Sequence, residues 1–505
     1  MIVIAGGGPN GLMLAGELAL SGARAVVLER LPERSAQPKA NGMVGQVVRL
    51  LDHRGLHQRL GGGPAPFAVP YFMFGALPLD LGRLEVNPIT ILPVPQRRLE
   101  EVLAQRATEL GVEIRRGHEV SGFTQDGFGV TVSVRGPDGE YEIAGSHLVG
   151  ADGGGSTVRK LAGIDFPGLT TVHTVSRSAH VALPESAIVD GRLDVPGFGR
   201  IASASFTRTE RGVFVFAQLE PGKPMITTVE WDAGPGDDVP MSIEELRSSV
   251  RRVLGADVPI GEPVTDGPKL LRRLSGGNTR LAAEYRSGRV FLVGDAAHVH
   301  SAMGGPGLNL GLQDVANLGW KLAAHAQDRA PAGLLDTYEQ ERRPLAERVV
   351  LHTQAQSALV APGGEVTALR ELLAELLNDA ENIRRIAELM AGADVRYQMS
   401  CAHPLAGRFV PDIPLADGAR IADLMHAGRP VLLDFSGSPE PGHVAGGWAD
   451  RVDLVRARSA QPPAAVLLIR PDGYVAWAGE DVHDGLRESL TEWFGAATFV
   501  AANKA

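Results

Sequence analysis

The chain opens with a short apolar run, a glycine-rich turn and a second apolar pattern. Residues 2–5 are apolar and largely β-branched, as in strands buried within a parallel sheet. Residues 12–21 predict a helix that ends before Gly22, and residues 25–28 predict a second buried strand that ends at Glu29. The start of the chain therefore predicts a complete β-α-β unit.

A mixed α/β pattern continues to about residue 150. It predicts a helix at 99–110, strands at 112–115 and 147–151, and a hairpin of 130–134 with 141–143. The hairpin rests on the Gly-Pro-Asp-Gly turn at 136–139, which separates the two alternating segments. A buried-strand pattern returns at 289–294, and a long helical region follows from about 308 to 391.

The segment between these α/β parts has a different pattern. Strand-length segments with partial alternation occur at 180–183, 201–206, 212–216 and 225–231. They predict an antiparallel sheet with one solvated face. Ser242 and Glu245 have the spacing of a capping box at the start of a helix that runs to about Leu254.

The pattern changes once more after about Tyr397. Strands are predicted at 430–435, 465–470 and 474–477, with a turn at 471–473 and a final helix at 486–493. The chain is therefore predicted to be an α/β protein with three domains. The predicted boundaries are 1–170 with 276–395 for the first domain, 171–275 for the middle sheet, and 396–505 for the C-terminal domain.

Composition narrows the function classes. The 505 residues suffice for two to four domains, and 44% hydrophobic with 21% charged residues is typical of a globular protein. The net charge of −10 argues against nucleic-acid binding. The basic pairs Arg115-Arg116 and Arg342-Arg343 are interpreted as solvated ends of elements.

Cysteine usage and hydropathy indicate the compartment. Cys401 is the single cysteine, so a disulfide, a CxxC motif and a cysteine-rich metal site are excluded, and a buried thiol is expected. The N-terminal apolar residues have no basic region before them, and Asn10 and Glu17 interrupt them, unlike a signal peptide. No apolar stretch is long enough to span a membrane. We expect a cytoplasmic protein that contacts no membrane and holds no metal.

The first glycine turn predicts a dinucleotide site. Gly6, Gly8 and Gly11 fit G-x-G-x-x-G directly after a strand and before a helix, so a pyrophosphate would lie at the helix N-terminus. Glu29 lies where a carboxylate accepts hydrogen bonds from ribose hydroxyls, and it disfavours a 2′-phosphate. FAD and NAD therefore remain, and NADP is disfavoured as the group held by this turn.

Two further acidic motifs follow predicted strands. Asp152, Ser156 and Arg159 form D-G-x-x-S-x-x-R, in which Ser156 can cap a short helix. Gly294-Asp295-Ala296-Ala297-His298 precedes the glycine-rich segment 304–309, which opens the long helical region. Taken singly, each carboxylate could equally be a turn former.

Three such signals in this order resemble the single-component FAD-dependent aromatic hydroxylases, the para-hydroxybenzoate-hydroxylase-like group A flavoprotein monooxygenases. The resemblance covers about residues 1–350. It implies a Rossmann-like FAD domain of the GR2 type with an inserted antiparallel substrate sheet. The segment that opens at His403 resembles the thioredoxin-like tail of aromatic-polyketide hydroxylases, and without two cysteines it is expected to be structural or an interface.

The resemblance also assigns residues. The glycine turn should hold the FAD pyrophosphate, Glu29 the adenosine ribose, Val120 the adenine and Asp295 the ribityl chain, while Gly307, Leu308 and Asn309 should face the flavin N1–C2=O edge. Asp152 and Arg159 match a motif associated with both FAD and the NAD(P)H path. The complete predicted cofactor set is Gly6, Gly8, Pro9, Asn10, Gly11, Glu29, Arg30, Lys39, Gln96, Val120, Asp152, Arg159, Gly294, Asp295, Pro306, Gly307, Leu308 and Asn309.

The chemistry that the resemblance implies is oxygen insertion. NADPH or NADH reduces FAD, the reduced flavin takes up O₂ as a C4a-hydroperoxide, and one oxygen atom passes to a polycyclic phenol of the aromatic-polyketide type. The protein supplies binding, orientation and exclusion of water, and no catalytic side chain is assigned. The expected partners are this small molecule and O₂, with a monomer or homodimer as the assembly. Antibiotic biosynthesis or modification is the expected setting.

Two further groups of residues are less specific signals, namely a set of aromatic residues that could form a wall of the substrate site and a pair of histidines. Tyr71, Phe72 and Phe74 could stack on a polycyclic substrate or form a core strand, and the pocket is the interpretation that we favour. His298 and His300 are interpreted as packing beside the cofactor rather than as a base or a metal site.

Other activities stay open. Relatives usually carry two prolines and a glutamine where this chain has Ser301, Ala302 and Pro306. Baeyer–Villiger or ring-rearranging oxygenation in the same family, or a flavoprotein that transfers no oxygen, therefore remain alternatives. Halogenation is disfavoured because the tryptophans do not form W-x-W-x-I-P.

Overall fold

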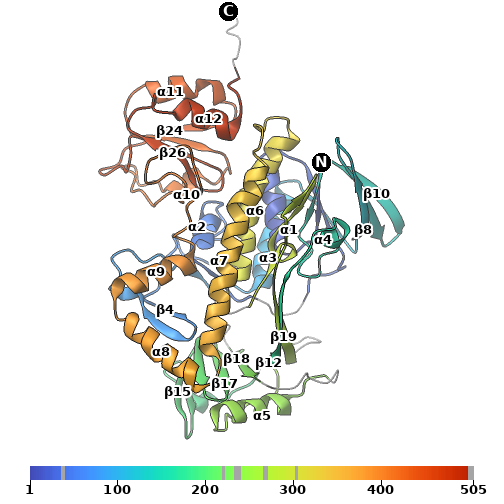
Figure 1. Ribbon diagram of the computed structural model, residues 1–505, viewed down its shortest axis with the longest axis vertical. Coiled ribbons are helices and arrows are strands. Elements are labelled where there is room, and N and C mark those ends of the chain that lie inside the picture. The colour runs from blue at the N-terminus through green and yellow to red at the C-terminus, as the bar shows by residue number, and fades with distance from the viewer. Residues whose placement is uncertain (36–39, 219–221, 232–239, 265–270, 302–304, 499–505) are drawn as a thin grey trace, which may run out of the picture.

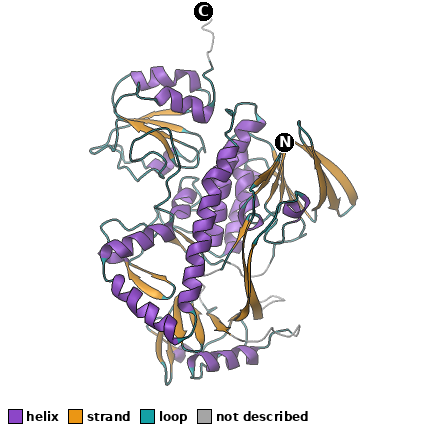
Figure 2. Ribbon diagram, viewed as in Figure 1, coloured by secondary structure: helices purple, strands orange, loops and turns teal. Residues whose placement is uncertain are grey.

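The computed structural model describes residues 1–35, 40–218, 222–231, 240–264, 271–301 and 305–498 (Figure 1). Helices and strands alternate in the N-terminal and C-terminal parts, and the lower part of the view combines helices with strands (Figure 2). These strands pair in an antiparallel sheet. This arrangement confirms the predicted α/β class with an inserted antiparallel sheet.

A six-stranded sheet forms the centre of the N-terminal part, in the order β20-β21-β11-β1-β2-β7. Its strands are parallel except at the β20 edge, and β1 and β11 are buried along their whole length, which explains their continuous apolar sequence. The strands are β1 Ile2–Ala5, β2 Ala25–Glu29, β7 Glu113–Arg116, β11 His147–Gly150, β20 Arg286–Ser287 and β21 Val290–Leu292.

Four helices and a small sheet accompany these strands. Helices α1 and α6 pack side by side, and α3 packs on α1 (Figure 1). Their bounds are α1 Pro9–Leu20, α3 Gln96–Glu109 and α6 Pro306–Ala326, and the short α4 is Thr157–Leu161. The predicted hairpin is confirmed within a three-stranded sheet of β8 Glu119–Gln125, β9 Val130–Gly136 and β10 Gly139–Gly145.

The middle sheet is antiparallel and has the order β16-β17-β18-β12-β19-β22. Burial alternates along β18, as a sheet with one covered face requires, and helix α5 supplies the cover with Leu246 and Val250. The elements are β12 Gly168–His180, β16 Ser205–Thr209, β17 Gly212–Ala217, β18 Met225–Trp231, β19 Leu271–Leu281, β22 His298–Val299 and α5 Ile243–Leu254, beside a small sheet of β13 Ile188–Val189, β14 Arg192–Val195 and β15 Gly199–Ala202.

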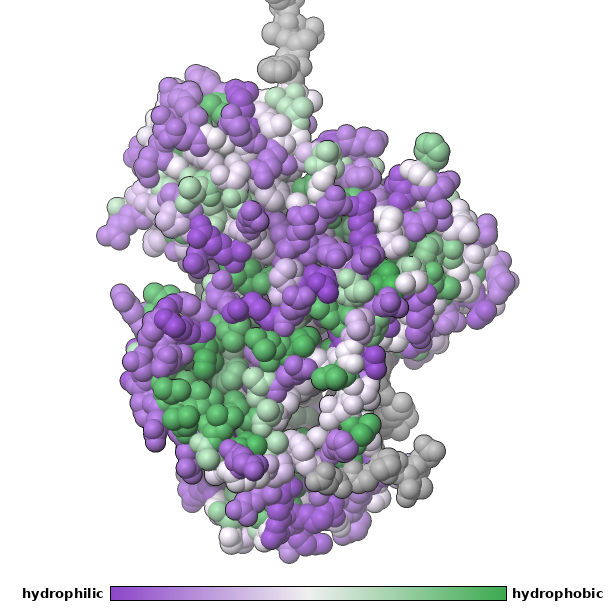
Figure 3. Space-filling model, viewed as in Figure 1, coloured by the Kyte–Doolittle hydropathy of each residue, from purple (hydrophilic) through white to green (hydrophobic). Residues whose placement is uncertain are grey.

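Helix α7 (Asp336–Val360) runs from the N-terminal part to the middle sheet (Figure 1). Beside its far end, β4 (Tyr71–Phe74) and β5 (Leu77–Asp80) form a hairpin that packs with α8 and α9 around Phe74, Leu79 and Leu359. The remaining elements of this region are α8 Gly364–Leu376, α9 Ala380–Ala391, α2 Gln46–Asp52, β3 Met43–Val44 and β6 Ile91–Leu92. Figure 3 shows apolar surface over α8, where Leu369, Leu372 and Leu376 are exposed.

The C-terminal part is a separate four-stranded sheet in the order β24-β23-β25-β26. The β23–β24 pair is parallel and the other two pairs are antiparallel, an arrangement that agrees with the expected thioredoxin-like domain. Its elements are α10 Ile421–Leu424, β23 Val431–Asp434, α11 Glu440–Ala445, β24 Asp453–Arg456, β25 Val466–Ile469, β26 Val475–Gly479 and α12 Leu486–Phe494. Cys401 is half-buried rather than buried and donates its thiol to the Ala478 carbonyl.

Two strand predictions in the middle sheet are wrong. The predicted strand 180–183 is only the end of β12, which stops at His180. The predicted strand 201–206 is divided between β15 and β16, because the chain turns at Ala204 with φ of +58°. An alanine in the left-handed region gives no sequence signal, since glycine and asparagine are the usual residues there.

The prediction for the basic pair at Arg342 is also wrong. Its guanidinium is fully buried, and its Nε donates to Asp314 Oδ1 at 2.8 Å. Nη1 donates to the Tyr397 hydroxyl at 2.9 Å and Nη2 to the Leu310 carbonyl at 3.2 Å. The partners lie on α6 and at the start of the C-terminal domain, so Arg342 connects three parts of the chain.

Two buried histidines make the fold sensitive to acid. Burial, and then the charges of His325 and His300 respectively, lower the pKa of His147 to about 3 and that of His352 to about 4. Unfolded histidines take up protons below about pH 6.5, where both folded side chains stay neutral. The unfolding free energy should therefore fall as the pH drops, by about 1.4 kcal/mol per pH unit and per histidine.

Urea unfolding of the wild type and of His352→Gln at pH 7.5 and pH 5 measures this effect. The free-energy advantage of the wild type over His352→Gln should shrink by about 2 kcal/mol at the lower pH. Gln354, which is exposed on the same helix and does not titrate, supplies the control substitution Gln354→Ala, whose effect should not depend on pH. A wild-type advantage that is the same at both pH values would contradict a neutral His352.

Candidate functional site

A single continuous cavity of about 1120 Å³ lies between the N-terminal sheet and the middle sheet. One end is lined by the loops that follow β1, β2 and β11 and by the start of α6. The other end is lined by the β4–β5 turn, the middle sheet and α7. Residues that represent the two ends are Gly8, Glu29, Asp152, Asp295 and Leu308 at the first, and Phe72, Phe206, Met225, Leu274 and Gln356 at the second.

The glycine turn has the geometry of a pyrophosphate cradle. A Cβ on Gly6, which has φ of +110°, would lie 2.3 Å from the Ala151 carbonyl oxygen, and one on Gly11 would lie 1.9 Å from the Gly6 carbonyl oxygen. Both glycines are therefore required by close backbone packing. A Cβ on Gly8 would meet no atom within 4 Å and would enter the cavity at the N-terminus of α1. This open space at a helix N-terminus fits an anionic pyrophosphate.

Glu29 lies at the end of β2 and closes the cradle. Its Oε2 accepts from the Gly7 N–H at 2.6 Å, and its Oε1 accepts from the Leu31 N–H at 2.8 Å. Each carboxylate oxygen keeps lone-pair capacity for a ribose hydroxyl. Arg30 and Val120 line the same end of the cavity, whereas the predicted Lys39 lies outside the described residues.

The second motif is a rigid loop at the cavity edge. Asp152 lines the cavity, accepts from the Ser156 hydroxyl at 2.5 Å and also accepts from the Thr157 and Val158 N–H groups. Ser156 caps α4 as predicted. Arg159 is buried and does not line the cavity; it donates to the Ala296 and Gly154 carbonyls and stacks on Phe166. Arg159 therefore joins this loop to the third motif.

The third motif places the carboxylate of Asp295 in the cavity. Gly294 has φ of +59°, and the Asn10 side chain packs where its Cβ would stand. Asp295 is exposed to the cavity, and its carboxylate makes no hydrogen bond to any described residue. The buried Oδ1 of Asn10 also lacks a partner within the described part of the chain. The Asp295 carboxylate and Asn10 Oδ1 can therefore each accept a hydrogen bond from a bound polar group.

The N-terminus of α6 faces the same space. Gly305 has φ of +69° and precedes Pro306, the first residue of the helix, so the helix begins earlier than predicted. Gly307 and Leu308 line the cavity with the N–H groups of a first turn, which have no partner within the helix. Asn309 does not line the cavity; its Oδ1 accepts from the Val44 N–H at 3.3 Å and holds α6 against β3.

Gln96 completes the cofactor end. It begins α3 and lines the cavity, with its Nε2 donating to Glu100 at 2.8 Å and its Oε1 3.4 Å from the Ala40 N–H. Pro9 and Asn10 also line the cavity. Gly11, Gly294 and Pro306 belong to the same segments but do not line it. These cavity-lining and supporting positions together fit FAD.

A buried polar network around Asp314 supports the loop of the third motif. Asp314 on α6 accepts from His298 Nε2 at 2.6 Å, from Arg342 and from the Gly294 N–H at 3.3 Å. Burial alone would raise the pKa of Asp314, but His298 and Arg342 hold it below its usual value. His298 therefore packs beneath the site as predicted, whereas His300 lines the cavity.

The second end of the cavity is apolar and aromatic. Phe72 lines it, as predicted, but Tyr71 is exposed and Phe74 is buried in the hydrophobic cluster behind the wall. Tyr71 is exposed at the start of β4, whereas Phe74 at its end is covered by α7 and α9. Met73, Phe206, Met225 and Leu274 line this end without having been predicted.

The β4–β5 turn that walls this end is held by polar side chains. Gly75 and Ala76 both have positive φ and line the cavity. Arg370 on α8 donates to both of their carbonyls, and Gln356 on α7 accepts from the Gly75 N–H at 3.3 Å. Sequence reasoning missed these residues because no local motif marks them. Their positions follow only from the packing of α7 and α8 against the hairpin.

The described part of the chain contains no cluster of three or more His, Cys, Asp and Glu side chains that could hold a metal. No described helix is both long and apolar enough to cross a bilayer.

Comparison with known proteins identifies the family. A family model described as "FAD binding domain" matches residues 1–353, and one described as "Aromatic-ring hydroxylase, C-terminal" matches residues 403–497. The chain belongs to the family of FAD-dependent aromatic-ring hydroxylases, and it is a flavoprotein monooxygenase of that family. The predicted family and FAD as its cofactor are thereby confirmed.

Particular relatives cover nearly the whole chain. The 12-dehydrotetracycline 5-monooxygenase/anhydrotetracycline 6-monooxygenase of Streptomyces rimosus is 44% identical, with 98% of each chain covered. The solved structure of the anhydrotetracycline hydroxylase OxyS from Streptomyces rimosus superposes with a TM-score of 0.86 at 42% identity, covering 98% of this chain and 99% of that one. The dialkyldecalin synthase of Streptomyces rugosporus is 36% identical, with 98% of this chain and 99% of its own covered.

Proposed function

We propose that this protein hydroxylates a planar polycyclic phenol of the aromatic-polyketide type, with NADPH or NADH as the electron donor. The observation that carries the proposal is the continuity of the cavity from the glycine cradle to the apolar end. A substrate in that end would lie directly against a bound flavin. When bound, FAD supplies the redox chemistry that couples the nicotinamide donor to O₂.

The chain's own residues divide the remaining tasks. We assign the pyrophosphate to Gly8 and the α1 N-terminus, the adenosine ribose to Glu29, and the ribityl chain to Asp295. Gly307 and Leu308 would present N–H groups to the flavin edge, where the α6 dipole favours negative charge. Arg159 and Asn309 do not line the cavity, and we assign to them the positioning of the loop after β11 and of the start of α6.

The substrate class follows from the lining of the second end. Phe72 and Phe206 offer aromatic faces, and Met73, Met225 and Leu274 offer apolar contact suited to a flat ring system. Gln356 and Arg272 place polar groups at the same end, where they can orient phenol or carbonyl oxygens. The relatives that act on anhydrotetracycline support a fused polycyclic phenol of this kind.

Asp295→Asn should weaken FAD binding without weakening the fold. A hydrogen bond to a charged group contributes about 1.5–3 kcal/mol, so the Kd for FAD should rise by about 10- to 150-fold. The melting temperature of the FAD-free protein should not change, because the carboxylate has no partner among the described residues. Quenching of flavin fluorescence gives the Kd, and thermal unfolding gives the stability.

Asp138→Asn is the matched control for this substitution. Asp138 is exposed in the β9–β10 turn and does not line the cavity. This variant should retain the wild-type Kd for FAD. An Asp295→Asn protein that binds FAD as tightly as the wild type would remove the ribityl assignment.

The proposed function is tested by turnover of a substrate panel. The purified FAD-loaded enzyme is incubated with NADPH or NADH and with anhydrotetracycline, alizarin or para-hydroxybenzoate. We expect a polycyclic phenol to accelerate NAD(P)H oxidation and to yield a product heavier by one oxygen atom, and we expect para-hydroxybenzoate to do neither. Faster turnover with the single-ring phenol would contradict the proposed substrate class.

A second candidate activity for the same site is rearrangement of a ligand without oxygen transfer. Two observations favour it: the full-length similarity to a dialkyldecalin synthase, and Ser301, whose hydroxyl accepts from Ser357 on α7 at 3.0 Å where relatives usually have proline. Ala302 lies outside the described residues. Conversion of a ligand to an isomeric product without consumption of NADPH or O₂ would favour this candidate.

The proposal also includes the domain boundaries, the compartment and the oligomeric state. We propose the domain boundaries given by the sequence, although β12 and β19 each continue across one of them. A cytoplasmic monomer or homodimer is consistent with the single cysteine and the net charge of −10.

A further inference from the structure

His300 lies where the two ends of the cavity meet. It lines the cavity immediately after β22, and a Cβ on Gly307 at the start of α6 would lie 3.4 Å from its Cε1 and 3.6 Å from its Nε2. Asp295 at the cofactor end and His352 on α7 lie near enough to interact electrostatically with it. The imidazole therefore borders both the proposed flavin position and the proposed substrate position.

The hydrogen bonds of His300 define where its proton resides. Nδ1 lies 3.0 Å from the Ser301 carbonyl oxygen, which can only accept, so Nδ1 carries the hydrogen. Nε2 has no hydrogen-bond partner among the described residues, and in the neutral ring it is therefore an unprotonated acceptor. The His298 ring stacks on the His300 ring, with the two ring centroids 6.3 Å apart. His298 Nε2 is hydrogen-bonded to Asp314.

The surroundings keep this imidazole neutral in the resting protein. Burial lowers the pKa of His300; the Ser301 carbonyl opposes the shift, His298 adds to it, and Asp295 opposes it. The N-terminus of α6 also disfavours positive charge beside Gly307. From α7, His352 is the titratable neighbour, and its own pKa is lowered to about 4, so it is neutral as well.

We propose that His300 is the general base that accepts the phenolic proton of the substrate. The phenol O–H bond breaks, the proton passes to His300 Nε2, and the electron pair stays on oxygen as a phenolate. The step is redox-neutral, and it raises the electron density of the ring carbon that is to be hydroxylated. The assignment rests on the proposed function, because it requires a phenolic substrate at the second end of the cavity.

Ionisation of a bound dye tests this base without turnover. Alizarin is a polycyclic phenol whose visible absorbance moves to longer wavelength when it ionises, and it is titrated on the FAD-loaded enzyme without NADPH. We expect bound alizarin to ionise at least about one pH unit below the free dye, a tenfold change in proton affinity. A wild-type enzyme that does not lower the ionisation pH of alizarin overturns the proposal.

Two substitutions separate the base from a structural role. His300→Asn keeps a donor for the Ser301 carbonyl and removes Nε2, whereas His300→Gln keeps a polar atom near Nε2 that cannot take up a proton. Both should raise the ionisation pH of bound alizarin by at least about one unit. They should also lower kcat for a polycyclic phenol by about 10²- to 10⁴-fold, with recovery at a pH that ionises the phenol in solution.

His483→Gln is the control, because His483 is an exposed histidine of the C-terminal domain that does not line the cavity. This variant should ionise alizarin as the wild type does. If both His300 variants bind alizarin and ionise it at the wild-type pH, the base assignment is overturned. Failure of the proposed function is visible separately, as the absence of an oxygenated product from the wild type.

Discussion

Gly8→Val should abolish FAD binding while the protein still folds. Gly8 has an ordinary backbone conformation with φ of −76°, and no atom lies within 4 Å of the place where its Cβ would stand. A valine therefore fits the ligand-free fold and fills the cradle in which the pyrophosphate would approach the backbone. We expect the Kd for FAD to rise at least about 100-fold, equivalent to about 2.7 kcal/mol.

The measurement is flavin content after purification, together with FAD titration of the FAD-free protein. Gly364→Val is the matched control, because Gly364 also lies at the start of a helix in open space but outside the cavity. It should retain flavin. A Gly8→Val protein that purifies with a full complement of flavin would show that the pyrophosphate lies elsewhere.

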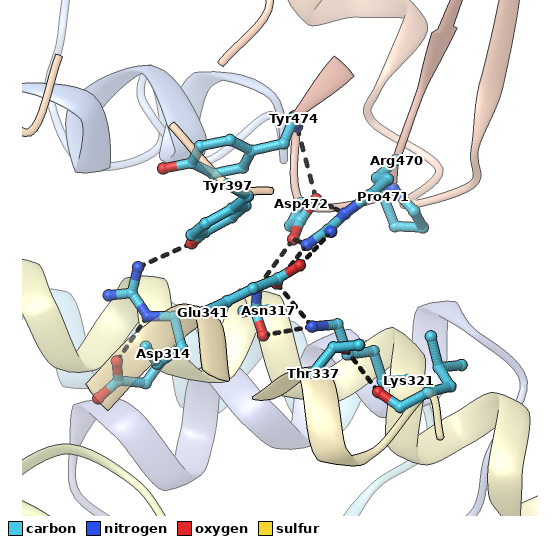
Figure 4. A network of polar contacts seen from close by, with 12 residues as sticks. Asp314, Asn317, Lys321, Thr337, Glu341, Tyr397, Arg470, Pro471, Asp472 and Tyr474 are labelled. Atoms are coloured by element: carbon cyan, nitrogen blue, oxygen red, sulfur yellow. Dashed lines mark hydrogen bonds and ion pairs between the residues drawn. The ribbon is translucent and has the colours of Figure 1, made fainter. Parts of the chain in front are cut away.

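Glu341→Gln should strongly destabilise the fold, because it removes the central charge of a buried network. Glu341 on α7 accepts from Arg470 of the C-terminal domain at 2.6 and 2.8 Å, and from Lys321 on α6 at 2.7 Å (Figure 4). Burial opposes ionisation, yet these two cations lower the pKa of Glu341 to about 2. When the charge of Glu341 is removed, Arg470 and Lys321 stay buried, and Asp472 is the carboxylate that remains beside them.

Loss of one partner from a buried charge network typically costs about 3–5 kcal/mol. Urea or thermal unfolding of the Glu341→Gln protein should show a loss of this size. Glu347→Gln is the control on the same helix, because Glu347 forms an exposed pair with Arg343 and should contribute less than about 1 kcal/mol. Equal effects of the two substitutions would contradict a structural role for the buried network.

This network also explains how the C-terminal domain is attached. Arg470 and Asp472 lie in the turn after β25, which reaches between α6 and α7. The Pro471 carbonyl in the same turn accepts from Arg54, which is paired with Glu17 on α1 at 2.7 and 2.8 Å. The domain that lacks a CxxC motif therefore braces the helices whose N-termini form the cofactor end.

The cofactor end could be predicted from sequence because its signals are local. Gly6, Gly8 and Gly11 are required by contacts within one turn, and Glu29 closes the β-α-β unit in which they lie. Such motifs need only the chain immediately around them. The same holds for Ser156, whose capping of α4 depends on a residue three positions away.

The substrate end and the supporting network could not be predicted in this way. Arg342 was predicted to be solvated. Its partners Asp314 and Tyr397 come from distant parts of the sequence, so no local pattern indicates that it is buried. The turn at Ala204 has neither glycine nor asparagine at its position of positive φ. Phe72 could not be separated from Tyr71 and Phe74 without knowing which side chains α7 and α9 cover. These features depend on packing between elements rather than on local pattern.

The central claim is that FAD and a polycyclic phenol share this cavity and that the phenol receives an oxygen atom from O₂. The most direct test is a turnover of the purified enzyme with NADPH and anhydrotetracycline under ¹⁸O₂, followed by mass spectrometry of the product. We expect a product heavier than the substrate by one ¹⁸O atom, with that label absent under ordinary O₂. A product that forms without ¹⁸O, or that is isomeric with the substrate, would contradict the claim.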